Sequence, residues 1–247
     1  MIQNAFQGFG CAFKGIQLMT QPGIRRFVII PLGINLVLFS LAIYFLGTLF
    51  DQAISYLMPD FPDWLSWLAD LIVWILWPLF AVMIVFLVFY TFTYVASLIA
   101  APFNGLLAEK VEAYVRGETP TQGSLLPTWK MISKSLGSIV SSLWYVIKWS
   151  ILLLIISLIP VINVAAPVLW FIFGAWVLTL NYLDPPMGNH DHFFKDVIGY
   201  ARQRKPSALG FGSAMVLFTS IPVVNFIAMP AGVAGATYLW VKQEQGA

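Results

Sequence analysis

The chain has 247 residues, 60% of them hydrophobic and 10% charged, and its formal net charge at pH 7 is only +2. Soluble domains carry about 25% charged residues, so the composition excludes an ordinary soluble protein. The near-neutral charge gives no argument for a nucleic acid as partner. The single cysteine, Cys11, excludes an internal disulfide and provides no redox or metal framework.

Four long stretches of the chain contain no charged residue: 27–50, 71–108, 149–183 and 207–241. About 20 apolar residues cross a hydrocarbon core of roughly 30 Å, so each stretch is long enough to span a bilayer. No cleavable signal peptide, low-complexity tract or long linker is evident. We therefore predict an all-α integral membrane protein in which residues 1–247 form a single membrane domain.

The spacing of apolar residues near the start of the chain predicts an amphipathic helix over residues 5–20. Phe6, Phe9 and Phe13 recur at three- and four-residue steps, opposite the polar Lys14. Glycines between them weaken the helical pattern. A helix lying on the membrane surface and an ordinary packed helix both fit this spacing.

A turn with two arginines precedes the first long apolar stretch. Pro22 and Gly23 end the preceding helix, and Arg25 and Arg26 fall at the start of the next one. Positive side chains are unfavourable beside the unpaired N–H groups of a helix N-terminus, whereas an anion is favourable there. The arginines are therefore either the positive cytoplasmic flank of a membrane helix or part of an anion site.

Residues 27–50 and 71–103 are predicted to form two membrane-spanning helices, the second of which can extend to residue 118. Pro102 can kink or stop this second helix. The connection 51–70 carries aspartates but no Lys or Arg. By the positive-inside rule it is external, and the other polar segments are cytoplasmic.

Two further polar segments have a helical pattern. Glu109 and Glu112 would lie one turn apart on one helix face, either solvated or facing a basic partner. Residues 129–148 predict an amphipathic helix. Its polar stripe either lines a wet path or lies in water at the membrane interface.

The last two apolar stretches are interrupted by nearly the same sequence. Residues 159–163 read Ile-Pro-Val-Ile-Asn, and residues 221–225 read Ile-Pro-Val-Val-Asn. A second proline follows each of these turns, and two prolines so close together disfavour one straight helix. The arm 149–159 would rise only about 16 Å as a helix, which is well short of a full span.

These features predict that 149–183 and 207–241 are re-entrant helical hairpins, with proline-kinked full spans as the alternative. Charge counting favours re-entry, because a single crossing by 149–183 would place the next, basic segment outside. Paired proline-interrupted segments are also typical of transporter pathways. We expect Asn163 and Asn225 to supply amide donors at the hairpin tips.

The sequence shows no catalytic or metal motif. His190 and His192 flank Asp191, but no third ligand at a regular spacing completes a zinc set. No phosphate loop or nucleophile elbow is present. We therefore predict no catalytic residue, metal or cofactor. A membrane enzyme that uses Asp184, His190 and Asp191 is the weaker alternative.

Together these motifs resemble the CysZ-type sulfate transporter family. The matching stretches keep the family's order along the chain: 22–26 with Pro31 and Asn35, 101–112, the two Ile-Pro-Val-x-Asn turns, 183–190 and 229–237. One departure is Ile24, where the family pattern has leucine. The change matters little if backbone N–H groups bind the ligand.

The resemblance implies a multi-pass inner-membrane protein that brings sulfate into the cytoplasm for cysteine synthesis. The implied fold has two long transmembrane helices and two partly penetrating helical hairpins. The implied assembly is a homo-oligomer in contact with membrane lipid. Carried over by position, the resemblance places sulfate on Gly23, Ile24, Arg25 and Arg26.

The resulting hypothesis is that the two guanidiniums pair with the sulfate dianion while backbone amides of residues 23–26 donate hydrogen bonds to it. Glu109 or Glu112 would hold an arginine when the site is empty. The alternative is a membrane scaffold that needs no ion. Its hairpins would pack against partner subunits, and its arginines would bind lipid headgroups.

Overall fold

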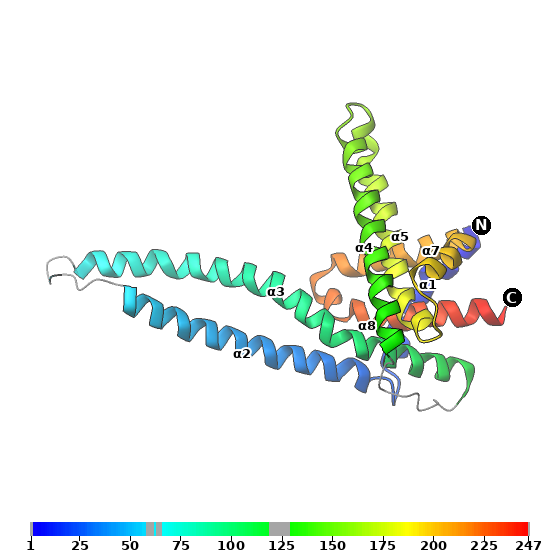
Figure 1. Cartoon of the computed structure of the whole chain (residues 1–247), viewed down its shortest axis with the longest axis horizontal. Helices are drawn as coiled ribbons and strands as arrows, with labels where there is room; N and C mark the ends of the chain where they lie inside the picture. The colour runs from blue at the N-terminus through cyan, green and yellow to red at the C-terminus, as the bar shows by residue number, and fades with distance from the viewer. Residues whose placement is uncertain (1, 58–61, 63–65, 119–128, 247) are drawn as a thin grey trace. The chain divides into compact units, whose positions relative to one another are not determined.

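The computed structural model describes residues 2–57, 62, 66–118 and 129–246, and every regular element in these ranges is a helix (Figure 1). The elements are α1 (Ile2–Met19), α2 (Arg26–Leu57), α3 (Ser66–Arg116), α4 (Trp129–Ser157), the short 3₁₀ helix η2 (Ile162–Ala165), α5 (Ala166–Gly188), α6 (Phe194–Gln203), α7 (Lys205–Ser220) and α8 (Pro222–Gln245). The predicted all-α class is confirmed.

The helices form two compact units. One comprises Met1–Val28 with Asn104–Ala247, and the other comprises Ile29–Phe103. Both boundaries fall inside helices, α2 and α3, so no linker separates the units. The single membrane domain expected from the sequence stays a prediction.

The unit Ile29–Phe103 consists of the long parts of α2 and α3. Arg26–Gln52 and Ser66–Ile84 are each long and apolar enough to cross a membrane. Phe50 stacks on Phe80 with ring centroids 3.6 Å apart, which joins the two helices. The two predicted long apolar helices are therefore present. Pro102 does not stop α3, which runs 51 residues to Arg116.

The first hairpin has longer arms than the sequence predicts. The amphipathic helix expected at 129–148 and the short arm expected at 149–159 form one helix, the 29-residue α4, about 44 Å long. Val140–Ser157 and Ile162–Gly188 are each long and apolar enough to span a bilayer. The short-arm argument for re-entry is therefore wrong here, and re-entry itself stays a prediction.

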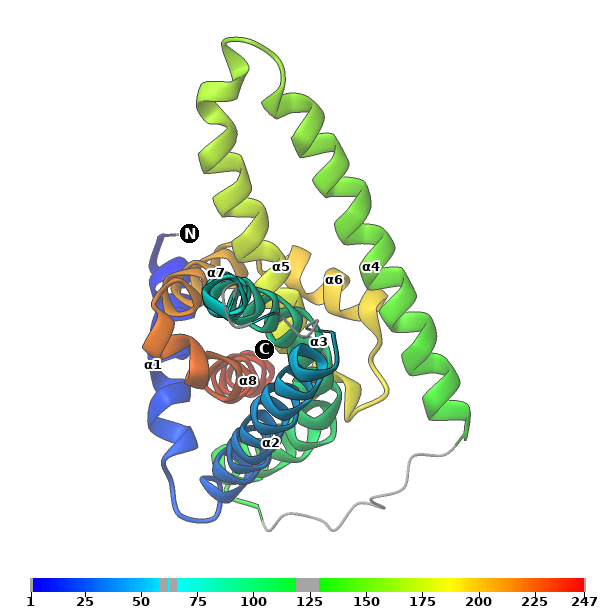
Figure 2. The same ribbon diagram turned by 90° about the vertical axis from the view of Figure 1, so that its left-hand side faces the viewer.

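The turn between α4 and α5 lies where the first Pro-x-x-Asn sequence predicts it. Val161 adopts a positive φ of 73°, and the exposed Asn163 follows in η2. The Trp170 indole N–H donates to the Ser157 hydroxyl across the turn, at 3.1 Å. Beyond the turn, α4 and α5 separate (Figure 2).

The second hairpin turns before its first proline. α7 ends at Ser220, and Pro222 occupies the first turn of α8, where a missing N–H costs little. Pro230 lies inside the 24-residue α8, so the expected turn between the two prolines is wrong. α7, with 16 residues, rises only about 24 Å, less than a full span.

Small residues form the contacts by which α1 packs against α7 and α8 in the larger unit (Figure 2). A side chain added at Gly8 would overlap the Ser207 carbonyl oxygen, and one at Gly15 would overlap the Ala231 carbonyl oxygen. Lipid is as apolar as these side chains, so the hydrophobic effect does not drive helices together in a membrane. Close backbone packing holds such helices together instead. Two of the glycines that weakened the sequence pattern of α1, Gly8 and Gly15, lie on its contact face.

The phenylalanine face of α1 points away from this core. Phe6 is 73% exposed and Phe13 is 51% exposed, whereas Cys11 and Ala12 are buried. Burial raises the pKa of the Cys11 thiol to about 11. α1 is thus a packed helix that also presents an apolar outer face, and that face is where the predicted contact with lipid would form.

Candidate anion site and its supporting network

The predicted sulfate-binding residues form a tight turn between α1 and α2. Gly23 has a φ of +88°, which favours glycine at this position. Ile24 is only 3% exposed and fixes the turn to the core of the larger unit. The backbone amides of Ile24 and Arg25 both donate to the Gln21 carbonyl oxygen, at 3.1 Å each.

Arg25 is the last residue of this turn and Arg26 is the first residue of α2, and both are exposed. The Arg26 guanidinium lies 4.9 Å from the Phe27 ring centroid. Among the described residues neither arginine forms an ion pair. Two unpaired guanidiniums therefore stand at the positive end of the α2 dipole, where an anion would be stabilised.

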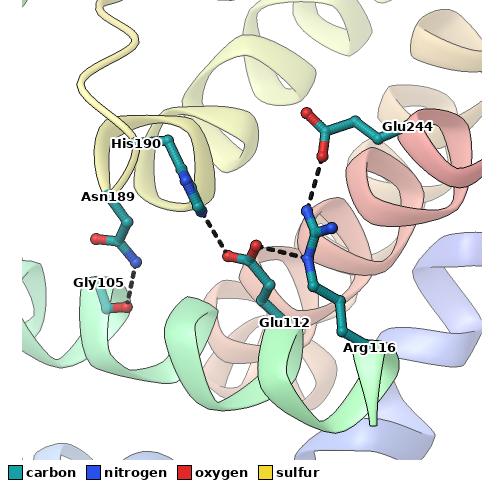
Figure 3. A network of polar contacts seen from close by, with 6 residues as sticks. All are labelled: Gly105, Glu112, Arg116, Asn189, His190 and Glu244. Carbon is teal, nitrogen blue, oxygen red and sulfur yellow. Dashed lines mark hydrogen bonds and ion pairs between the residues drawn. The ribbon is translucent and has the colours of Figure 1, made fainter. Parts of the chain in front are cut away.

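The two glutamates expected to hold these arginines have other partners. The Glu109 carboxylate lies 3.3 Å from the Lys110 ammonium. One oxygen of Glu112 accepts from Arg116 Nε at 2.8 Å, and the other lies 2.8 Å from His190 Nε2 (Figure 3). The arginine held by Glu112 in this structure is therefore Arg116.

Arg116 links α3 to α8. Its Nη2 donates to the Glu244 carboxylate at 2.7 Å, and its guanidinium lies over the Trp240 ring at 5.9 Å. Burial alone would lower the pKa of Arg116, but its hydrogen bonds and charge interactions with Glu244 and Glu112 outweigh this effect and raise the pKa. Arg116 is therefore a fixed positive charge between two carboxylates.

The segment after α5 completes the network. The Asn189 side-chain amide donates to the Gly105 carbonyl oxygen at 2.8 Å (Figure 3). The His190 ring packs 4.8 Å from the Trp240 ring, measured between centroids. The segment that contains Asn189 and His190 thus connects the end of α5 to α3 and α8. The four-residue spacing of Glu112 and Arg116 predicts their ion pair on a helix. No local sequence pattern indicates that His190 is their neighbour.

Glu112→Gln is expected to destabilise the protein by about 1–3 kcal/mol, because it leaves Arg116 and His190 without their shared carboxylate. Glu109→Gln is the matched control on the same helix. It removes only a part-buried pair with its neighbour Lys110 and should cost at most about 1 kcal/mol. Thermal unfolding of both variants in detergent measures the difference. Equal melting temperatures would contradict a structural role for the network.

The other sequence candidates lie apart from these contacts. Asn163 is exposed in η2, and Asn225 is exposed in the first turn of α8, where its backbone N–H donates to Ile221 O at 2.8 Å. Asp184 is not part of the His190 network, which gives the enzyme alternative no shared site. Within the described part of the chain, no three His, Cys, Asp or Glu side chains group to hold a metal ion.

The arginine turn, the first hairpin, and Asn189 and His190 also lie within one known family pattern. The model of the family described as "Sulfate transporter CysZ/Etoposide-induced protein 2.4" matches residues 11–230. The chain belongs to this family. The resemblance inferred from the motifs is confirmed over most of the sequence.

Curated relatives from several Pseudomonas species align over nearly their whole length. A protein of Pseudomonas fluorescens strain Pf-5 named "Sulfate transporter CysZ" is 47% identical over 93% of this chain and 91% of its own. Proteins of the same name from Pseudomonas syringae pv. tomato strain DC3000 and Pseudomonas paraeruginosa strain PA7 are 42% and 40% identical. They cover 95% and 94% of this chain, and 91% and 93% of their own. The alignments therefore cover more than 90% of the length of each of these three relatives.

Proposed function

We propose that the protein transports sulfate across the inner membrane into the cytoplasm, where it supplies sulfur for cysteine synthesis. The observation that carries this proposal is the pair of guanidiniums at the start of α2, which form no ion pair with the described residues, in a chain whose relatives are named sulfate transporters. Helices long enough to span a bilayer provide the membrane setting.

Sulfate is held in this proposal by charge and by backbone donors together. Arg25 and Arg26 offer two planar, permanently charged groups that match the oxygens of a dianion. The amides of Ile24 and Arg25 already donate to Gln21 O, so the amides of Gly23 and Arg26 are the two in the turn that an anion would use. The bonds to Gln21 keep the turn in shape whether or not sulfate is present.

The hairpins form the membrane path in the same proposal. The second hairpin enters the bilayer without crossing it, as the short α7 favours, and the protein works as a homo-oligomer surrounded by lipid. The buried, small-residue faces of α7 and α8 keep this hairpin packed against its own unit. The exposed apolar faces of α4 and α5 are then free for lipid or a second subunit.

The deciding experiment is uptake of radiolabelled sulfate by proteoliposomes that contain only this protein. We expect uptake above that of empty liposomes, and competition by unlabelled sulfate but not by chloride. Uptake equal to that of empty liposomes would reject transport and favour the scaffold alternative, in which the arginines bind lipid headgroups.

Asn163→Leu and Asn225→Leu are each expected to slow sulfate flux severalfold while changing the sulfate dissociation constant by less than about twofold, because each removes an amide donor from a hairpin tip but leaves the turn intact. Val164→Leu is the control, since Val164 is an exposed apolar neighbour in η2. Proteoliposome flux and calorimetry on the same preparations separate the two effects. Unchanged flux in both asparagine variants would remove these residues from the pathway.

A further inference from the structure

A polar cavity lies in the larger unit, and neither Arg25 nor Arg26 lines it. Its volume is about 300 Å³, and its polar wall is made by Lys14, Gln17, Gln21, Tyr114, Tyr238 and Lys242. These side chains come from α1 and the turn after it, the end of α3, and α8. None of the four residues 23–26 lines it.

The scaffold of the cavity is rigid because α1 and α8 approach each other closely. A side chain at Gly15 would overlap Ala231 on α8, and one at Gly235 would fall 2.7 Å from the Cys11 carbonyl oxygen. Lys14 and Gln17 lie three residues apart on α1, and Tyr238 and Lys242 lie four apart on α8, so each pair shares one helix face. The two lysines are thus held on opposite walls by fixed backbone packing.

The wall of the cavity carries positive charge and hydrogen-bond donors. It contains two ammonium groups and no carboxylate. Lys14 Nζ donates to the neutral Gln17 side-chain oxygen at 2.7 Å, and among the ion pairs of the described residues none involves Lys14 or Lys242. The ammonium groups, the amide NH₂ groups and the tyrosine hydroxyls all donate. The repulsion between the two ammonium groups falls when an anion binds between them.

We propose that this cavity is a second oxyanion site, which takes a tetrahedral dianion such as sulfate together with part of its hydration shell. The volume fits this ligand, since a water molecule occupies about 30 Å³ in the liquid and several can accompany the ion. A bare metal cation is excluded because the wall holds no anionic ligand. The identity of the dianion as sulfate rests on the proposed function, whereas the oxyanion chemistry does not.

Gln21 connects the two sites. It lines the cavity, and its carbonyl oxygen holds the amides of Ile24 and Arg25 in the arginine turn. Gln21 lies two residues before Gly23, so an ion leaving the turn meets a second set of donors close to it in the chain. We infer that sulfate that leaves the arginine turn binds next in this cavity, within the same unit.

The test is calorimetric titration of the purified, full-length protein in detergent with sulfate and, separately, with phosphate. In the Arg25→Ala/Arg26→Ala background one weaker sulfate-binding event should remain. Adding Lys14→Ala and Lys242→Ala should weaken that event about tenfold or more, because it removes both charged donors. Lys14→Arg with Lys242→Arg should retain it. Lys195→Ala with Lys205→Ala removes the same charge from exposed positions outside the cavity and should leave it unchanged.

Each contrary result overturns the proposal. Unchanged sulfate binding in the Lys14/Lys242 alanine variant would show that the cavity does not bind, and an equal loss in the Lys195/Lys205 control would show a general charge effect. A lipid phosphate is the other source of the same chemistry. If the Lys14/Lys242 change affects binding to phosphatidylglycerol nanodiscs but not to free sulfate or phosphate, the ligand is a headgroup. Failed uptake by the parent protein, with intact sulfate binding in the cavity, would reject transport and leave the site standing.

Discussion

Replacing both Arg25 and Arg26 by alanine is expected to weaken the tighter sulfate-binding event by at least about 100-fold while the protein still folds. Each charged hydrogen bond contributes about 1.5–3 kcal/mol, so losing two corresponds to at least about 3 kcal/mol. Both side chains are exposed and make no ion pair among the described residues, so the fold does not depend on them. Calorimetry measures the affinity, and the melting temperature in detergent checks the fold.

Two further variants make this result specific. Arg25→Lys with Arg26→Lys keeps the charge but loses the planar fork, and we expect an intermediate affinity. Arg202→Ala with Arg204→Ala removes two guanidiniums from the end of α6 and should leave the tighter event unchanged. Sulfate affinity that is unchanged in the Arg25/Arg26 alanine variant would move the site elsewhere. The positive-inside reading of the two arginines would then be the better one.

The long helices and the turn of the first hairpin could be predicted from the sequence, because uninterrupted apolar runs and the Pro-x-x-Asn sequence at Pro160 are local signals. Their boundaries were harder to predict. The predicted boundary between residues 148 and 149 was based on the change from a polar to an apolar segment. No proline or glycine interrupts the backbone there, so α4 continues through this position. Pro230 also stays inside α8, where helices packed in a membrane protein tolerate a proline because neighbouring groups satisfy the freed backbone.

Contacts between distant segments account for what the sequence could not show. The partners of Glu112 and Arg116 include His190 and Glu244, which lie 78 and 128 residues away along the chain. The sequence left open whether α1 lies on the membrane surface or packs as an ordinary helix, and it did not identify the glycines as a packing face. In water its phenylalanines would be buried first, whereas beside lipid they can remain outside while the glycines allow the backbones to approach.

Gly8→Ala is expected to destabilise the protein by about 1–3 kcal/mol, whereas the same change at Gly10 should stabilise it by up to about 1 kcal/mol. Both residues lie in α1, and alanine favours the helix equally at each. At Gly8 the added methyl would overlap the Ser207 carbonyl oxygen of α7, which is backbone and cannot rotate away. At Gly10 it would meet nothing within 4 Å.

The opposite signs separate helix propensity from interhelical packing, and thermal unfolding in detergent measures both. Gly210→Ala tests the other side of the same contact, because its methyl would overlap the Ala5 carbonyl oxygen, and it should destabilise by a similar amount. If Gly8→Ala and Gly210→Ala melt at or above the parent temperature, α1 does not pack on α7 by backbone approach. The arginine turn, which is tied to α1 through Gln21, would then lack its fixed support.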